Sequence, residues 1–249
     1  MDRKCYFLIP AAGSGTRMGA GQPKLLRNVE GSPVILRTLG AVTDVCRCNY
    51  ADLDYKIILI TTQDLIESLK VMCNEYFPDI DIGYTLGGDT RTESVSNGIK
   101  AITGARDEDL VLVHDGARCL VTTDEIIACI DGLKDHTVCA SAVPVKNTLK
   151  EVELLPSGEI RVTGTPDRSK FYEILTPQGF KYKDISMCYK RAVEEGISAT
   201  DDTALATAFG LDVYLTKGFY SNLKITTPED IAIASEIVRS RGESEPFSD

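Results

Sequence analysis

The feature that most constrains this fold is an alternation of short apolar runs with segments of helical periodicity. The apolar, β-branched runs span residues 5–10, 56–61, 80–86, 110–114 and 137–143. Apolar residues three and four positions apart mark the segments between them, at 33–45, 63–77, 91–102 and 123–133. This alternation predicts an α/β fold, in which a mainly parallel sheet is covered by helices on both faces.

The pattern changes between residues 144 and 167. Two short apolar stretches flank the turn sequence Leu155-Pro-Ser-Gly-Glu159, which is typical of a β-hairpin. We expect this hairpin to project from the sheet as an arm. Either a second subunit covers the arm, or the hairpin folds back on its own domain.

Helical patterns resume at 181–195 and 201–209, and a strand is predicted at 211–215. A last helix should start with Thr227 as N-cap and Pro228 as its first residue, and should run to about Arg241. Because no Pro/Ser-rich linker interrupts the chain, residues 1–241 are expected to form one domain. Residues 242–249 then form a polar tail.

Charge and hydropathy exclude several functional classes. The 249 residues hold 27 Lys and Arg against 37 Asp and Glu, a net charge of −10, which argues against a basic nucleic-acid-binding face. The sequence lacks the roughly 18-residue apolar run of a membrane span, so we expect a cytoplasmic protein without a leader. The eight cysteines are scattered through apolar segments, which favours buried, reduced thiols.

The most informative motif directly follows the first predicted strand. It reads Pro10-Ala-Ala-Gly-Ser-Gly-Thr-Arg-Met18 and is followed by Pro23-Lys24. Small residues let backbone N–H groups approach a phosphate closely, and Arg17 and Lys24 add two positive charges. This combination suits a nucleoside triphosphate. The alternative is a tight strand-to-helix turn with two surface cations.

Three further segments add chemistry. Asp115 stands at the end of the predicted strand at 110–114, where a carboxylate close to phosphates can bind Mg²⁺, although it could simply cap the next loop. Gly87-Gly-Asp-Thr-Arg-Thr-Glu-Ser94 can admit a flat ring beside its glycines, although an N-cap explains part of it. Lys224 precedes the last helix, whose N-terminus favours anions.

Taken in order, these segments resemble the 2-C-methyl-D-erythritol 4-phosphate cytidylyltransferases over nearly the whole chain. The matching segments are 10–24, GGD at 87–89 with Ser94, HDGAR at 114–118, PVKNT at 144–148, 167–180, TDD at 200–202 and NLKITTPEDI at 222–231. The resemblance implies a single Rossmann-like, glycosyltransferase-A-like nucleotidyltransferase domain. It implies synthesis of CDP-methylerythritol and pyrophosphate from CTP and a polyol phosphate in the non-mevalonate isoprenoid pathway. A homodimer with crossing β-arms is implied as well.

The resemblance also implies a role for individual residues. Arg17, Lys24 and Lys224 would be the catalytic residues, and Asp115 would bind the metal, Mg²⁺ or another divalent cation. The nucleotide-binding residues would be Ala11, Gly13, Gly88, Asp89, Ser94 and Gly116. The acceptor-binding residues would be Thr148, Arg168 and Thr176, some of them supplied by the partner subunit.

Three positions depart from the family pattern. The arm has Asn147 where Asp is usual, Cys119 stands where Pro usually follows HDGAR, and Leu25 where Gln usually follows Pro-Lys. Asn147 bears on which acceptor is used. The nearest alternative functions are a ribitol 5-phosphate cytidylyltransferase and a catalytically silent CTP-binding relative.

The expected chemistry needs no general base, because the oxygen of a phosphate monoester is already largely ionised at neutral pH. We therefore expect His114 to support the fold from behind the site. His136, in a loop, is expected to be solvated.

Overall fold

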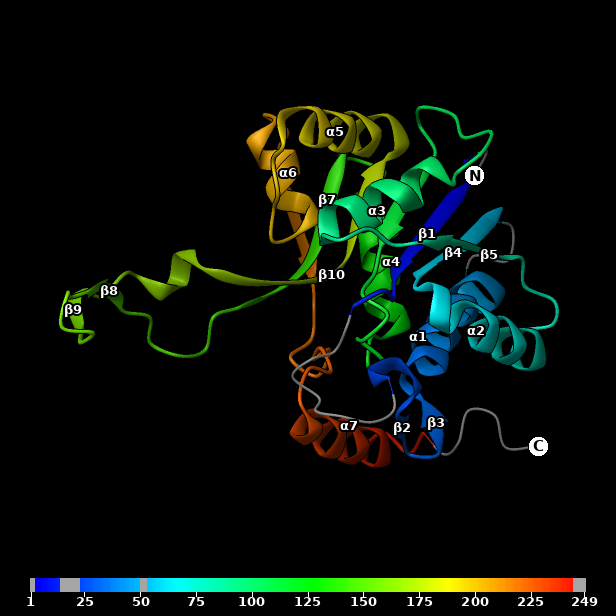
Figure 1. Ribbon diagram of the computed structural model, residues 1–249, viewed down its shortest axis with the longest axis horizontal. Helices are drawn as coiled ribbons and strands as arrows, with labels where there is room; N and C mark the ends of the chain where they lie inside the picture. Colours follow the sequence, from blue (N-terminus) through cyan, green and yellow to red (C-terminus); the bar gives the residue numbers. More distant parts are fainter. Residues whose placement is uncertain (1–2, 14–22, 50–52, 244–249) are drawn as a thin grey trace.

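Seven strands form the central sheet of the protein (Figure 1). The computed structural model describes residues 3–13, 23–49 and 53–243. The strand order is β11 (Tyr214–Lys217), β7 (Val138–Pro144), β10 (Tyr172–Lys181), β6 (Leu110–Val113), β1 (Cys5–Pro10), β4 (Tyr55–Thr61) and β5 (Ile82–Leu86). Every pairing in this sheet is parallel except the two made by β10. The predicted mainly parallel α/β sheet is confirmed.

Helices cover both faces of the sheet, because side chains alternate between the two faces of each strand. In β1, Cys5, Phe7 and Ile9 join one core, whereas Tyr6 and Leu8 join the other. The first core is closed by α1 (Val34–Asp44), α2 (Gln63–Tyr76), α4 (Thr123–Gly132) and α7 (Pro228–Ser240). The second core is closed by α3 (Arg91–Lys100), α5 (Tyr182–Glu195) and α6 (Asp202–Ala208) (Figure 1).

Short elements complete the fold around α1 and α7. One turn of 3₁₀ helix, η2 (Lys24–Leu26), leads into a small antiparallel pair, β2 (Asn28–Val29) and β3 (Ser32–Pro33). A π-helical turn, η3 (Val45–Asn49), continues α1. The last helix starts at Pro228 with Thr227 as N-cap and ends at Ser240, as predicted.

A two-stranded hairpin projects far from the sheet (Figure 1). It consists of β8 (Glu151–Leu154) and β9 (Ile160–Gly164), joined by a turn in which Gly158 has φ +86°, a conformation that favours glycine. The predicted arm is confirmed. Its apolar side chains are exposed, from 55% to 73%, at Val152, Leu154, Ile160 and Val162.

The central strand β10 was not predicted. Its sequence contains Pro177, and proline removes a ladder donor, so the segment does not resemble a strand. In the structure Pro177 lies where the pairing with β7 shifts register between Ile174 and Gln178. The predicted strand at 211–215 is also wrong in its bounds, because β11 starts at Tyr214.

The remaining sequence-based expectations concern thiols, histidine and membrane spans. Seven cysteines with described side chains are free and buried, as expected. His136 is not simply solvated: it is half-buried and stacks on Tyr214, with ring centroids 3.6 Å apart. In the described ranges, no helix is long and apolar enough to cross a membrane.

Candidate active site

A cavity of about 390 Å³ opens at the carboxyl ends of β1 and β6. Open α/β sheets bind ligands at this edge, because the loops that leave the strands diverge there. The cavity is lined by Pro10, Ala11, Ala12, Gly13, Lys24, Leu25, Gly88, Asp89, Thr90, Arg91, Ser94, Asp115, Ala117 and Lys224. The structure therefore brings together predicted site residues from four distant segments of the chain.

The loop after β1 forms one wall of the cavity. Ala11 is buried and its N–H donates to the Ile60 carbonyl at 2.7 Å, which continues the parallel ladder past the strand end. Gly13 is exposed, and a Cβ built on it would meet nothing within 4 Å. Lys24 reaches the cavity from η2. Arg17 lies outside the described residues.

The segment from Gly87 to Ser94 forms the opposite wall. Ser94 Oγ accepts a hydrogen bond from the Gly88 N–H at 3.0 Å, which folds the loop back on α3. A side chain at Gly87 would come within 2.6 Å of the Ala12 Cβ, and one at Gly88 would collide with Glu93. The N-cap explanation also holds, because Thr90 caps α3 and forms a capping box with Glu93.

Asp115 is the electrostatic centre of the site. Its side chain is only 10% exposed, and its Oδ2 lies 3.0 Å from Lys224 Nζ and 3.3 Å from Arg118 Nε. Arg91 approaches Oδ1 at 4.0 Å. Burial alone would raise the pKa of Asp115, but these three cations together hold it well below its usual range. Asp115 is therefore a carboxylate at physiological pH.

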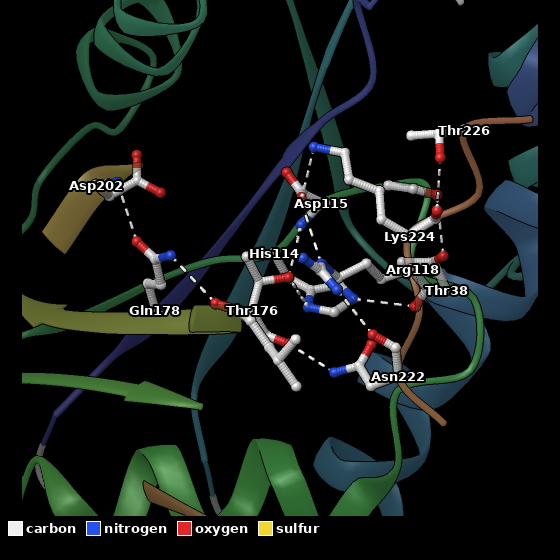
Figure 2. A network of polar contacts seen from close by, with 12 residues as sticks. Thr38, His114, Asp115, Arg118, Thr176, Gln178, Asp202, Asn222, Lys224 and Thr226 are labelled. Carbon is white, nitrogen blue, oxygen red and sulfur yellow. Dashed lines mark hydrogen bonds and ion pairs between the residues drawn. The ribbon is translucent and has the colours of Figure 1, made fainter. Parts of the chain in front are cut away.

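Behind Asp115, His114 and Thr176 fix the backbone of the HDGAR segment (Figure 2). His114 Nε2 lies 3.3 Å from the Arg118 carbonyl, which only accepts, so this nitrogen carries the proton. Nδ1 then accepts from Thr176 Oγ1 at 2.9 Å, and Thr176 Oγ1 accepts from the Asp115 N–H at 3.2 Å. Burial lowers the pKa of His114 to about 4, so the ring is neutral and structural, as predicted.

The loop before α7 carries Lys224 into the cavity. The Ile225 N–H donates to the Ala117 carbonyl at 2.8 Å, which places the loop beside the HDGAR segment. Asp230 accepts from the N–H groups of Thr226 and Thr227, at 2.7 and 2.8 Å, and so completes a capping box with the predicted N-cap Thr227. Lys224 itself is 40% exposed, and its ammonium group remains accessible from the cavity.

The predicted acceptor-binding residues fall in two places. Thr176 is buried behind Asp115, whereas Thr148 and Arg168 lie exposed on the segments that lead to and from the hairpin. Arg168 donates to the Lys146 carbonyl at 2.7 Å, which braces the base of the arm. Within one described chain, neither Thr148 nor Arg168 lines the cavity.

Gly116 lies at the back of the cavity rather than in its lining. Its N–H donates to the Pro10 carbonyl at 3.1 Å, and its own carbonyl accepts from Thr38 Oγ1 at 3.0 Å. A Cβ at this position would stand 3.1 Å from both the Pro10 carbonyl oxygen and the Ile35 side chain. Glycine is needed here because two strand ends approach closely.

The departures from the family pattern fall in different environments. Leu25 is buried in the core and also lines the cavity, and Cys119 is buried beside the HDGAR segment. Burial raises the pKa of Cys119 to about 12, so its thiol is protonated. Asn147 is exposed at the base of the arm.

Two cations of the site were not identified from the sequence. Arg91 forms a bidentate pair with the fully buried Asp202, at 2.7 and 2.6 Å, and Tyr189 also donates to this carboxylate. Arg118 bridges Asp115 to the Asn222 carbonyl. Both arginines lie inside the quoted motifs. Their positive charge close to Asp89 and Asp115 in the sequence is the signal by which they could have been assigned to the site.

Asp115 places a carboxylate at the wall of the cavity, and its Oδ2 is shared with Lys224 and Arg118. No cluster of three or more His, Cys, Asp or Glu that could hold a metal occurs among the described residues. Mg²⁺ does not require one, since it is usually held by one or two carboxylates, water and substrate phosphate oxygens. The ionised carboxylate of Asp115 at the cavity wall meets that requirement.

Comparison with known proteins agrees with this geometry. The family model for 2-C-methyl-D-erythritol 4-phosphate cytidylyltransferase (IspD) matches residues 5–240. A relative of that name from Nostoc sp. is 38% identical over 96% of this chain and 100% of its own length. Another from Synechocystis sp. is 39% identical, over 95% of this chain and 97% of its own.

Solved structures show the same likeness. The crystal structure of 4-diphosphocytidyl-2C-methyl-D-erythritol synthase from Anaerococcus prevotii covers 95% of this chain and 99% of its own, with TM-score 0.79 and 31% identity. The 2-C-methyl-D-erythritol 4-phosphate cytidylyltransferase of Thermus thermophilus covers 94% and 98%, with TM-score 0.72 and 26% identity. This chain belongs to the 2-C-methyl-D-erythritol 4-phosphate cytidylyltransferase family.

Proposed function

We propose that this protein transfers CMP from CTP to 2-C-methyl-D-erythritol 4-phosphate, giving CDP-methylerythritol and pyrophosphate in the non-mevalonate pathway to isoprenoids. The observation that carries the proposal is the single cavity in which Lys24, Asp115 and Lys224 face the Gly88 and Ser94 loop. Two lysine ammonium groups and a carboxylate thus share one cavity with the loop from Gly88 to Ser94. The curated relatives carry the name of this activity over almost the whole chain.

The nucleophile in this reaction is an oxygen of the acceptor phosphate, which is largely ionised at neutral pH. A general base is therefore unnecessary, and the site offers none in His114: its pKa is about 4, and both ring nitrogens are engaged by Thr176 and Arg118. The protein's task is to align two polyanions and to neutralise their charge.

Positive charge performs that task. Arg17 and Lys24 bind the triphosphate and stabilise charge on the departing pyrophosphate, the Gly13 backbone contacts a phosphate, and Lys224 binds the α-phosphate. Lys224 already lies 3.0 Å from Asp115, so its position is set before substrate arrives. Ala11, Gly88, Asp89 and Ser94 select cytosine, and Gly116 lies near the ribose.

Asp115 would hold Mg²⁺ or another divalent cation together with the nucleotide phosphates. A bound divalent cation would supply charge neutralisation on the phosphate oxygens. Lys224, Arg118 and Arg91 keep the carboxylate ionised over the whole physiological range of pH. This ionisation makes Asp115 available to the metal without proton release.

The active form is proposed to be a homodimer through the β-arm. Four exposed apolar side chains on the hairpin favour burial against a second copy, since a two-stranded hairpin alone is marginally stable. In that assembly Thr148 and Arg168 bind the acceptor phosphate at the partner's cavity, whereas Thr176, whose hydroxyl is engaged by His114 and by the Asp115 N–H, supports the site from behind.

The test is pyrophosphate release from CTP and Mg²⁺ with methylerythritol 4-phosphate and, in parallel, ribitol 5-phosphate. Release with the first acceptor alone is the expected result. Release with only the second would overturn the acceptor assignment and direct attention to Asn147. Tight CTP binding without release from either acceptor would identify a silent relative.

A further inference from the structure

Glu125 is a buried carboxylate that does more than cap a helix. Its Oε2 completes the capping box of α4 by accepting from Thr122. Its Oε1 points the other way and accepts from the Phe219 N–H at 3.0 Å and from Asn222 Nδ2 at 3.0 Å. The side chain is 0% exposed. One oxygen therefore anchors the loop that leads to Lys224.

Asn222 joins this anchor to the active site. Figure 2 shows Asn222 bonded to Thr176 and Arg118. Its Nδ2 donates to Glu125 Oε1 and, at 2.9 Å, to the Thr176 carbonyl. Both partners only accept, so the orientation of the amide is determined. Its backbone carbonyl accepts from Arg118 NH1 at 2.7 Å.

Two of the partners of Asn222, Thr176 and Arg118, also contact Asp115. Thr176 Oγ1 accepts from the Asp115 N–H, and Arg118 Nε approaches Asp115 Oδ2 at 3.3 Å. Lys224, two residues after Asn222, reaches the same Oδ2. Asn222 is thus hydrogen-bonded to two neighbours of the carboxylate with which Lys224 pairs.

Asn222 does not itself contact the cavity. It is 1% exposed and, in the part of the chain that the structure describes, it is not a lining residue. Any effect on the reaction must therefore pass through residues that do line the cavity. The ammonium of Lys224 sits at the end of a flexible four-carbon stem, so its location depends on how firmly the loop backbone is held.

We propose that Asn222, anchored by Glu125, is a positioning residue that holds Lys224 and Asp115 in register for the transfer reaction. The proposal rests on the proposed function, because the register matters only if Lys224 meets the α-phosphate. Lys224 acts on the transition state, so a small displacement of its loop lowers turnover.

The test is a double-mutant cycle of Asn222→Ala with Lys224→Met, measured by pyrophosphate release and by calorimetric CTP binding. Asn222→Ala should lower kcat about 10- to 100-fold in the wild-type background and less than about 3-fold in the Lys224→Met background. The effect of Asn222→Ala on CTP affinity should likewise be smaller in the Lys224→Met background than in the wild-type background. Thr43→Ala, which removes a hydrogen bond from a buried hydroxyl of α1, is the matched control and should change kcat less than about 2-fold.

An equal loss of kcat in both backgrounds would overturn the proposal, because a residue that acts independently of Lys224 lowers kcat by the same factor with or without the Lys224 ammonium. An Asn222→Ala variant whose kcat equals that of the wild-type protein would also overturn the proposal. Asn222→Ser, which keeps a small polar side chain and introduces no charge beside Glu125, carries the same cycle if the alanine variant does not fold. A wild-type protein that binds CTP without releasing pyrophosphate would refute the proposed function, and the CTP cycle would then decide this inference alone.

Discussion

Removal of the Lys224 charge should lower activity strongly and leave the fold almost intact. Lys224→Met keeps the apolar stem and deletes the ammonium that lies 3.0 Å from Asp115 Oδ2. Asp115 still contacts Arg118 at 3.3 Å and Arg91 at 4.0 Å. Because Lys224 is 40% exposed, the lost pair should cost at most about 1 kcal/mol of stability.

The effect on the reaction is larger. A unit charge about 4 Å from a phosphate oxygen is worth about 4 kcal/mol at an effective dielectric constant of about 20. With the exposure of Lys224 taken into account, we expect a loss of about 2–4 kcal/mol in transition-state stabilisation. This corresponds to a fall in kcat/KM of about 30- to 1000-fold.

Steady-state pyrophosphate release measures this loss, and thermal unfolding measures the stability. Lys134→Met is a matched control, since Lys134 is 47% exposed and pairs with Asp131 at 2.6 Å on the surface. The control should keep kcat/KM within about 2-fold of wild type. A Lys224→Met variant within 3-fold of wild type would refute the role of this ammonium.

Three further predictions address other parts of the site. Lys24→Ala should lower kcat by about 100-fold or more in the same assay, and unchanged turnover would refute its contact with the triphosphate. Arg168→Ala should raise the KM for the acceptor about 10-fold or more with little change in CTP affinity, and a selective loss of CTP affinity would show that the arm is misassigned. His114 is buried, and its pKa is lowered from 6.5 to about 4. As the pH falls, the unfolded state therefore takes up the His114 proton at a higher pH than the folded state does. The free energy of unfolding should be unaffected by this titration above about pH 6.5 and should fall by about 3 kcal/mol by about pH 4. Denaturant unfolding of wild type and His114→Gln across this range checks the slope, and equal slopes would contradict the buried neutral ring.

The elements that the sequence predicted well are those whose local pattern agrees with the global fold. β1 has a continuous apolar run, and α7 has Thr227, Pro228 and Asp230 at its N-terminus. β10 was missed because its strand character comes from its neighbours: it lies between β6 and β7, and Pro177 occupies a register shift in its pairing with β7. Tertiary pairing overrode local preference there.

The active site divides in the same way. Asp115, Lys24 and Lys224 stand in motifs at strand and helix ends, where loop chemistry is readable from local sequence. Glu125 carries no such mark, because a carboxylate in a helical segment resembles any polar surface residue. Asn222 stands in the quoted NLKITTPEDI segment, but nothing local marks it as an anchor of the loop. Their importance follows from burial and from partners nearly 100 residues away, as in the Asn222–Glu125 contact.

The sequence by itself determined the α/β class, the arm and the motif residues, because periodicity, turn chemistry and motif spacing are local properties of the chain. Only the tertiary structure decided that Arg91 pairs with Asp202, that Thr176 stands behind Asp115, and that Glu125 holds the loop of Lys224. These are contacts between distant segments. Burial makes each of them necessary, since a polar group removed from water must find its partner wherever the fold places one.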